Sequence, residues 1–151
     1  MYKRILLTLD TSGFAEVAIP HAVQMTNAFD AELCLLSVVP VIGVGEAQTM
    51  GLAATVEWEA EVAHTEEYLA GVQKALKADG INAEIELRRG NVAEEIMLFA
   101  VKYEADLIIM STHGRSGLGR WVYGSVTDRV LRYADVPVLL IRATEEHSDE
   151  D

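Results

Sequence analysis

The chain has 151 residues, half of them hydrophobic and about a quarter charged, with a net charge of −12, which fits one soluble domain around one core. The net negative charge argues against general binding to nucleic acid or anionic membranes. No apolar run approaches the roughly 20 residues of a membrane span. The single cysteine, Cys34, excludes an intramolecular disulfide. The first residues enter a strand-like segment without a signal-peptide pattern, so we expect a cytoplasmic protein.

The first third of the chain predicts a strand, a helix and a second strand. Residues 2–9 form the first strand pattern, and the segment from Asp10 to Gly13 supplies turn and helix-cap chemistry. Apolar residues then recur at helical spacing around Pro20, which is expected to kink the helix. Residues 31–39 are nearly all apolar, which is typical of a strand covered on both faces, and Cys34 is expected to be a buried thiol within it.

The middle of the chain predicts a loop, a long helix, a strand and a further helix. Residues 41–54 contain glycines and show no clear period, so we expect a mobile loop, either a lid over a ligand or a plain connector. Residues 55–79 predict a helix that Gly80 ends and in which Trp58 is a partial surface anchor. Residues 83–88 alternate like a strand, and residues 92–103 have helical spacing. The long helix has an apolar stripe made of Val62, Thr65, Leu69, Val72 and Leu76.

The last third begins with an apolar strand, residues 107–110, that leads into a glycine-rich loop. A helix follows Gly124 and Ser125, and a final strand runs from Val136 to Arg142. Residues 144–151 are acidic and are expected to form a disordered tail, which leaves residues 1–143 as the single domain. Strands that alternate with helices predict a doubly wound parallel sheet with helices on both faces. A ligand then lies at the carboxyl ends of the strands, where Asp10 and the glycine loop would face one crevice.

The glycine loop has the chemistry of a phosphate site. Gly114, Gly117 and Gly119 leave backbone amides unobstructed, and Gly124-Ser125 opens a helix whose N-terminus attracts anions. The region from Ser111 to Arg142 holds five arginines against two acids. An ordinary flexible loop with a solvated basic face is the alternative. The pattern is neither a dinucleotide fingerprint nor a Walker A loop.

Three segments together resemble the universal stress protein family over nearly the whole chain. They run from Ile5 to Ser12 (ILLTLDTS), from Ser111 to Val126 (STHGRSGLGRWVYGSV) and from Val136 to Arg142 (VPVLLIR). The ATP-binding branch of this family has a glycine, two residues, a second glycine, nine residues and then Gly-Ser or Gly-Thr. Here Gly114 is the second glycine and Gly124-Ser125 closes the pattern, but Ser111 occupies the position of the first glycine.

The resemblance implies a Rossmann-like, adenine nucleotide alpha hydrolase-like fold with five parallel strands in the order 3-2-1-4-5. It implies that Asp10 contacts the ribose or the adenine side, that the backbone of Val38 and Val39 holds the adenine edge, and that the glycine loop lines the triphosphate, with a magnesium ion as a further candidate. It also implies a homodimer through the last strand and a signalling protein partner. The complete predicted ligand set is Leu9, Asp10, Thr11, Ser12, Val38, Val39, Ser111, His113, Gly114, Arg115, Gly117, Gly124, Ser125 and Val126.

Two other functions stay open at this point. Ser111 in place of glycine suits a nucleotide-free dimeric interaction module of the same fold. A slow ATPase is the third hypothesis, although no paired carboxylates and no base beside a nucleophile accompany the loop. His113 is expected to orient the loop rather than to act as a general base. Asp10 could equally cap the helix that follows it. We therefore expect no dedicated catalytic activity beyond slow ATP hydrolysis.

Overall fold

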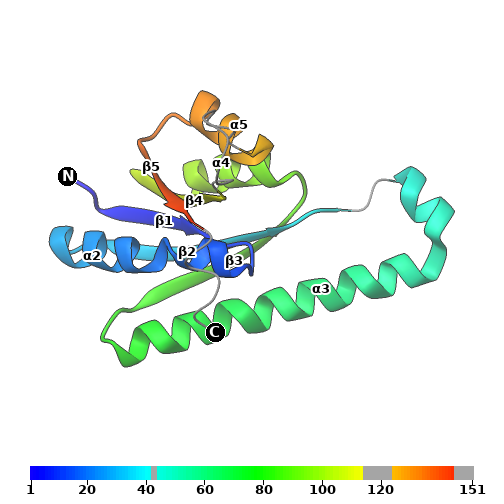
Figure 1. Cartoon of the computed structure of the whole chain (residues 1–151), viewed down its shortest axis with the longest axis horizontal. Helices are drawn as coiled ribbons and strands as arrows, with labels where there is room; N and C mark the ends of the chain where they lie inside the picture. The colour runs from blue at the N-terminus through cyan, green and yellow to red at the C-terminus, as the bar shows by residue number, and fades with distance from the viewer. Residues whose placement is uncertain (42–43, 114–123, 145–151) are drawn as a thin grey trace.

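A computed structural model describes residues 1–41, 44–113 and 124–144 and shows one five-stranded parallel sheet. The strands lie in the order β3-β2-β1-β4-β5, which confirms the predicted fold class (Figure 1). β4 is three residues longer than predicted, and the last strand begins two residues later than predicted, just after Pro137. The bounds are β1 (Arg4–Thr8), β2 (Glu32–Val39), β3 (Ala83–Arg89), β4 (Leu107–His113) and β5 (Val138–Ala143).

Helices cover both faces of the sheet because alternate side chains of each apolar strand point to opposite faces. Leu7 packs with α1 (Gly13–Glu16), α2 (Ile19–Phe29) and α3 (Val44–Ala78). Leu6 packs on the other face with α4 (Val92–Lys102) and α5 (Ser125–Tyr133). Cys34 is buried on that second face, as predicted. The winding therefore reverses between β1 and β4, which is where a doubly wound sheet opens a crevice.

Two helical segments differ from the prediction. The expected loop of residues 41–54 is wrong from Val44 onward, because α3 begins there and is interrupted only at Gly51, whose φ of 68° is not helical. The good helix formers between the glycines outweigh the glycines themselves. The helix around Pro20 is split in two, and Pro20 lies in the first turn of α2, where its missing N–H is tolerated.

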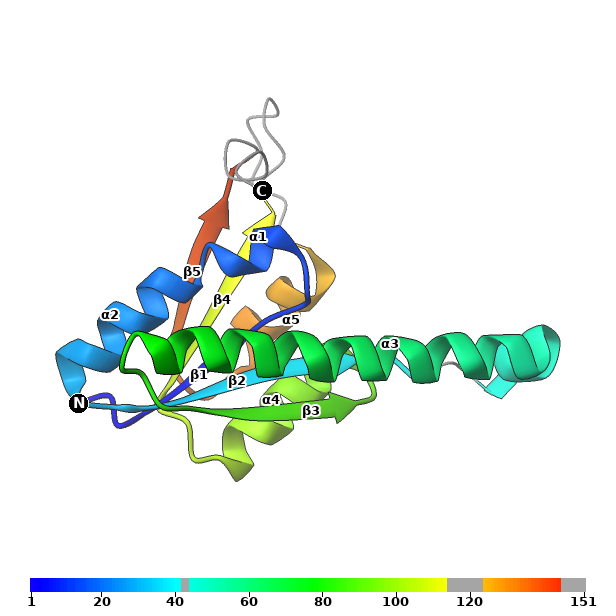
Figure 2. The ribbon, with the colours of Figure 1, turned by 90° about the horizontal axis from the view of Figure 1, so that it is seen from below.

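The first half of α3 runs beyond the end of the sheet, as Figures 1 and 2 show from two directions. Leu69 and Leu76 lie in the second half of α3, where they are buried and pack in the core against the sheet. Gly80, in the left-handed conformation with φ 84°, follows the helix as predicted.

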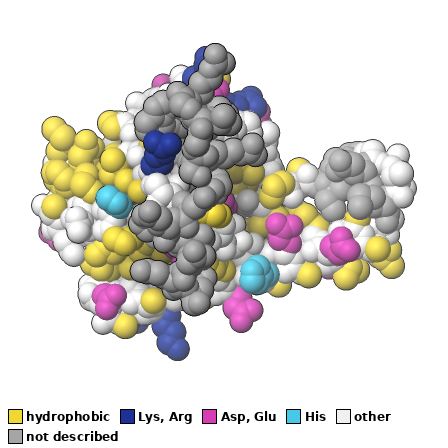
Figure 3. All heavy atoms as spheres, in the orientation of Figure 1, with side chains coloured by type: hydrophobic (Ala, Val, Ile, Leu, Met, Phe, Trp, Pro, Cys, Tyr) yellow, Lys and Arg dark blue, Asp and Glu magenta, His cyan; other side chains and the backbone are white. Residues whose placement is uncertain are grey.

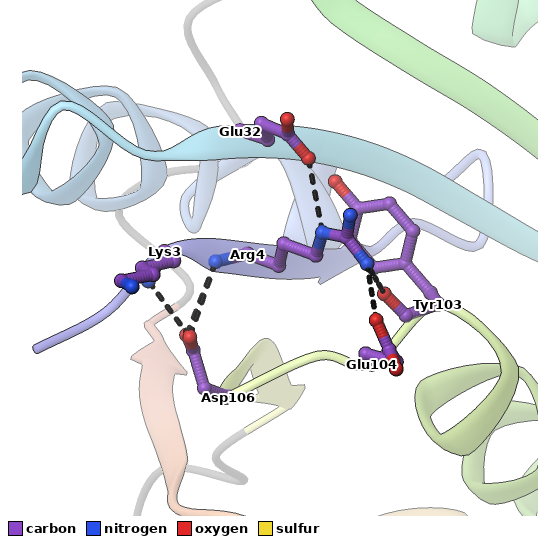
Figure 4. Close-up of polar contacts among 6 residues, drawn as sticks. All are labelled: Lys3, Arg4, Glu32, Tyr103, Glu104 and Asp106. Carbon is purple, nitrogen blue, oxygen red and sulfur yellow. Dashed lines mark hydrogen bonds and ion pairs between the residues drawn. The ribbon is translucent and has the colours of Figure 1, made fainter.

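Polar contacts fix the sheet at the amino ends of its strands (Figure 4). The Asp106 carboxylate accepts the backbone N–H of Lys3 at 2.7 Å and of Arg4 at 3.2 Å. The Arg4 guanidinium donates to Glu32 at 3.1 Å and to Glu104 at 2.8 Å. These contacts tie β1 to β2 and to the segment before β4, so the carboxyl ends of the same strands are held in register.

Candidate functional site

A crevice of about 320 Å³ lies at the carboxyl ends of β1, β2 and β4, within the usual range of small-molecule sites. Its walls come from both faces of the sheet, with α1 and α3 on one side and α4 and α5 on the other. Among the described residues it is lined by Thr8, Leu9, Asp10, Thr11, Ala15, Leu36, Ser37, Val38, Val39, Pro40, Glu61, Thr65, Val92, Ile96, Met110, Ser111, Val126 and Thr127.

The turn after β1 presents Asp10 to the crevice. Leu9 is held to β2, since its N–H donates to the Leu36 carbonyl at 2.8 Å and its carbonyl accepts the Ser37 hydroxyl at 2.6 Å. One carboxylate oxygen of Asp10 accepts the Ser12 N–H at 3.0 Å and the Ser12 hydroxyl. Ser12 is the residue that caps α1, by accepting the Ala15 N–H. Asp10 therefore orients the cap, and its second oxygen remains available to a ligand.

The end of β2 offers unpaired backbone groups. Val39 faces β3, because its carbonyl accepts the Gly90 N–H at 3.1 Å. Alternation then turns the N–H and the carbonyl of Val38 toward β1. β1 has ended at this level, since Thr8 lies opposite Leu36. Within the described parts of the chain no residue after β1 pairs with Val38. Val38 therefore presents one donor and one acceptor to the crevice.

The N-terminus of α5 closes the opposite side of the crevice. Gly124 is its N-cap residue and supplies no side-chain hydrogen bond, so the first amides of the helix are uncapped among the described residues. A Cβ placed on Gly124 would meet no atom of the described residues within 4 Å. Val126 and Thr127 line the crevice itself, whereas Ser125 lines a neighbouring hollow with Asn91 and Arg129.

The structure brings seven of the predicted residues into one crevice. These are Leu9, Asp10, Thr11, Val38, Val39, Ser111 and Val126. Ser12 supports the site by holding Asp10 and capping α1, and Gly124 and Ser125 directly precede the lining residue Val126 but do not line the crevice themselves. The backbone of His113 ends β4. The side chain of His113 and all of Gly114, Arg115 and Gly117 lie outside the described residues.

Sequence reasoning missed the wall that α3 contributes. Glu61 and Thr65 of α3 line the crevice, although the sequence indicated only that Thr65 belongs to the core stripe. Trp58 is half-buried, and its indole N–H donates to the Pro40 carbonyl at 2.7 Å, which is a more specific role than a surface anchor. The spacing of Trp58, Glu61 and Thr65, at intervals of three and four residues, places them on one face of a helix and is the feature of the sequence that could have indicated this wall.

The charges of the crevice are unevenly distributed. Asp10 and Glu61 are the ionisable side chains among its described lining residues, and neither Lys nor Arg is among them. Among the described residues, the uncapped amides of α5 are therefore the groups in the crevice region that favour an anion. Nowhere in the described residues do three or more His, Cys, Asp or Glu side chains gather as a metal site requires. No helix in the same residues has the length and apolar character to cross a bilayer.

Known proteins share both this sequence and this fold. Universal stress protein MJ0531 of Methanocaldococcus jannaschii is 37% identical over 146 residues, which cover 94% of this chain and 83% of the relative. The solved structure of MJ0577 from the same organism is 28% identical, covers 96% of this chain and 99% of its own, and has a TM-score of 0.75. UspA of Lactobacillus plantarum is 26% identical, with a TM-score of 0.78 and coverage of 93% and 98%.

More distant solved structures share the fold and hold nucleotides. A universal stress protein in complex with cAMP is 20% identical, covers 95% of this chain and 98% of its own, and has a TM-score of 0.62. An Arabidopsis thaliana family member with AMP bound is 16% identical, with coverage of 99% and 97% and a TM-score of 0.60. The universal stress protein family model matches residues 1–142. The chain belongs to the universal stress protein family.

Proposed function

We propose that this universal stress protein binds an adenine nucleotide, ATP in the first place, in the crevice between β1 and β4. The main support is the crevice itself: among the described residues, it has a backbone donor and acceptor without partners at one end and an uncapped helix N-terminus at the other. A nucleotide has matching ends, since its base edge carries donors and acceptors and its phosphates are anionic. The complexes of two family members with cAMP and AMP support the same ligand class.

The base end of the proposed ligand lies against β2. The N–H and carbonyl of Val38 complement the ring nitrogen and the amino group on the Watson–Crick edge of adenine. Val39, Val92 and Ile96 supply apolar surface for the ring faces. Asp10, with its orientation fixed by Ser12, accepts from a ribose hydroxyl.

The phosphate end of the proposed ligand lies at α5. The uncapped amides after Gly124 and the macrodipole of the helix favour negative charge there. Gly114, Arg115, Gly117 and His113 complete this end of the site in the proposal. A magnesium ion bound to the phosphates would offset the repulsion from Asp10 and Glu61.

Isothermal titration calorimetry with ATP and with AMP, each with and without Mg²⁺, tests the proposal. Binding should also stabilise the fold by RT ln(1 + [L]/Kd), about 2.7 kcal/mol at a hundredfold excess over Kd, which thermal unfolding measures. The diagnostic variant is Gly124→Asp, whose carboxylate caps α5 but repels phosphate; its matched control is Gly124→Asn, which caps α5 without charge. We expect Gly124→Asp to bind at least tenfold more weakly than Gly124→Asn. The absence of binding to the unaltered protein at millimolar nucleotide would reject the proposal.

A nucleotide-free interaction module is the second candidate, and Ser111 favours it. Ser111 lines the crevice and carries a Cβ where the ATP-binding pattern has glycine. Ser111→Gly distinguishes the two functions. If the protein is a nucleotide-free module, the unaltered protein does not bind ATP and Ser111→Gly does. The proposed function requires that the unaltered protein already binds ATP.

In its cellular role the protein is proposed to act in the cytoplasm as a homodimer whose nucleotide occupancy changes a surface that a signalling protein recognises. We propose no dedicated enzyme activity beyond slow ATP hydrolysis. Turnover well above one per minute that disappears in Asp10→Ala would contradict that view.

A further inference from the structure

One face of α3 forms a wall of the crevice. Trp58, Glu61 and Thr65 recur at intervals of three and four residues, so they lie on one side of the helix. Glu61 and Thr65 line the crevice together with Val38 and Val39 at the end of β2 and with Pro40, which follows it. Thr65 is buried, and its hydroxyl donates to the Glu61 carbonyl at 2.8 Å. This face is referred to below as the α3 wall.

Trp58 fixes the α3 wall against the end of β2. Its indole N–H donates to the Pro40 carbonyl at 2.7 Å, and the Arg89 guanidinium lies 5.3 Å from the centre of its ring. Pro40 directly follows Val39, and Arg89 is the last residue of β3. One side chain therefore joins α3 to the carboxyl ends of two neighbouring strands, and Glu61, one turn further along the helix, is held beside Val38 and Val39.

The Glu61 carboxylate is free to bind a ligand. No hydrogen bond or ion pair joins it to any residue of the described ranges, whereas Asp10, the other carboxylate of the lining, is engaged by Ser12. An ionised carboxylate only accepts hydrogen bonds. It therefore selects ligand groups that donate and repels groups that present lone pairs.

The position of Glu61 in the fold determines which end of a nucleotide it meets. α5 follows β4, while Val38 is the last residue but one of β2, and β1 separates these two strands. Two strand spacings amount to about 10 Å, comparable to the distance from a purine base to its phosphates. With the phosphates at α5, the base lies at β2 and the α3 wall.

We propose that Glu61 is a specificity-determining residue that accepts a hydrogen bond from the exocyclic amino group of a 6-aminopurine and disfavours a 6-oxopurine. This inference rests on the proposed nucleotide site and adds the feature of the base that the site discriminates. An amino group has two N–H donors, so the Val38 carbonyl and the Glu61 carboxylate can each accept one. A 6-oxo group would turn lone pairs toward both acceptors.

The test compares the affinities of ATP and inosine triphosphate, which has an oxygen in place of the amino group, by calorimetry in Mg²⁺. The key variant is Glu61→Gln, which keeps the shape but adds an amide donor. The matched control is Glu59→Gln, which removes the same charge from an exposed residue of α3 that is not among the crevice residues. We expect the preference for ATP to fall about tenfold in Glu61→Gln, because the new amide can donate to the 6-oxo group and so give inosine triphosphate about one hydrogen bond. The preference should stay unchanged in Glu59→Gln.

The outcomes separate this inference from the proposed function. If the unaltered protein binds neither nucleotide, the proposed function fails. If it binds ATP but Glu61→Gln keeps the same preference over inosine triphosphate, Glu61 does not read the base and only the inference fails. Equal changes in Glu61→Gln and Glu59→Gln would likewise overturn the inference, because they would reflect the loss of one charge anywhere on the helix.

Discussion

Thr11 lines the crevice with its backbone in the left-handed region, at φ 69°. A β-branched residue is strained there, whereas asparagine tolerates this conformation well. We expect Thr11→Asn to raise the free energy of unfolding by about 0.5–1 kcal/mol, measured as a shift of the urea midpoint at constant slope. A lower midpoint in the variant would mean that the threonine side chain stabilises the turn by more than its strain.

The buried thiol of Cys34 makes the free energy of unfolding depend on pH in the alkaline range. Burial, followed by the nearby charges of Glu84 and Glu86, raises the pKa of the thiol from 9.0 to about 12. The unfolded chain releases this proton near pH 9 while the folded chain retains it, so stability falls as pH rises above about 9.

The variant Cys34→Ala should weaken this decline in urea titrations between pH 8 and 11. Burial also raises the pKa values of Tyr68 and Tyr103, so a smaller decline persists in the variant. Identical pH profiles for the two proteins would show that the Cys34 thiol does not contribute.

At the scale of the elements, the sequence predicted those helices, strands and caps that depend only on the residues of their own segment. A continuous apolar run predicted β2, a period-two pattern predicted β3, and a period-3.6 pattern predicted the core stripe of α3. The cap chemistry near Ser12 predicted the start of α1. The start of α3 was missed because glycines in residues 41–54 signal loops, while the residues between them favour a helix. The sequence did not indicate that Glu61 lines the crevice, because the position of this helix depends on a contact of Trp58 with Pro40, which lies 18 residues earlier.

The variant Asp106→Ala tests whether the contacts at the amino ends of the strands affect stability without affecting nucleotide affinity. Asp106→Ala removes the acceptor of two backbone N–H groups of Lys3 and Arg4, and we expect it to lower the free energy of unfolding by about 1–2 kcal/mol. Because the crevice lies at the other end of the sheet, the affinity for ATP should not change.

The control for Asp106→Ala is Glu104→Ala, which removes only an exposed ion pair with Arg4 and should change stability by less than about 0.5 kcal/mol. A loss of nucleotide affinity in Asp106→Ala at temperatures where the variant is fully folded would contradict the separation of the two ends.

At the scale of the whole molecule, alternation of strands and helices predicted the doubly wound sheet, and the family resemblance supplied the strand order that the structure confirms. Both rules concern the order of elements along the chain, so they also placed Asp10 and Ser111 at one crevice. The α3 wall lies outside such rules, since it depends on how far one helix extends past the sheet (Figure 2).

The two edges of the sheet differ in a way that bears on assembly. β5 and β3 are the edge strands. β5 carries four successive apolar residues, Val138 to Ile141, all partly exposed, whereas β3 intersperses charged residues such as Glu84, Glu86 and Arg88. Figure 3 shows hydrophobic side chains gathered on the side of the molecule near the N-terminus, away from the projecting end of α3. Arg142, which is exposed, follows this apolar run in β5. A run of apolar residues on an edge invites pairing, whereas charges interspersed along an edge discourage it.

We therefore expect the proposed homodimer to form through β5, and a lysine on each edge tests this. Ile141→Lys should convert the dimer to a monomer in sedimentation velocity, because it places a charge in the shared apolar surface. Ile85→Lys makes the same change on an exposed residue of β3 and should leave the dimer intact. Circular dichroism and thermal unfolding establish that both variants are folded at the temperature of the run. A dimer that survives Ile141→Lys but dissociates in Ile85→Lys would assign the interface to β3, and a protein that sediments as a monomer without either change would remove the homodimer from the proposed function.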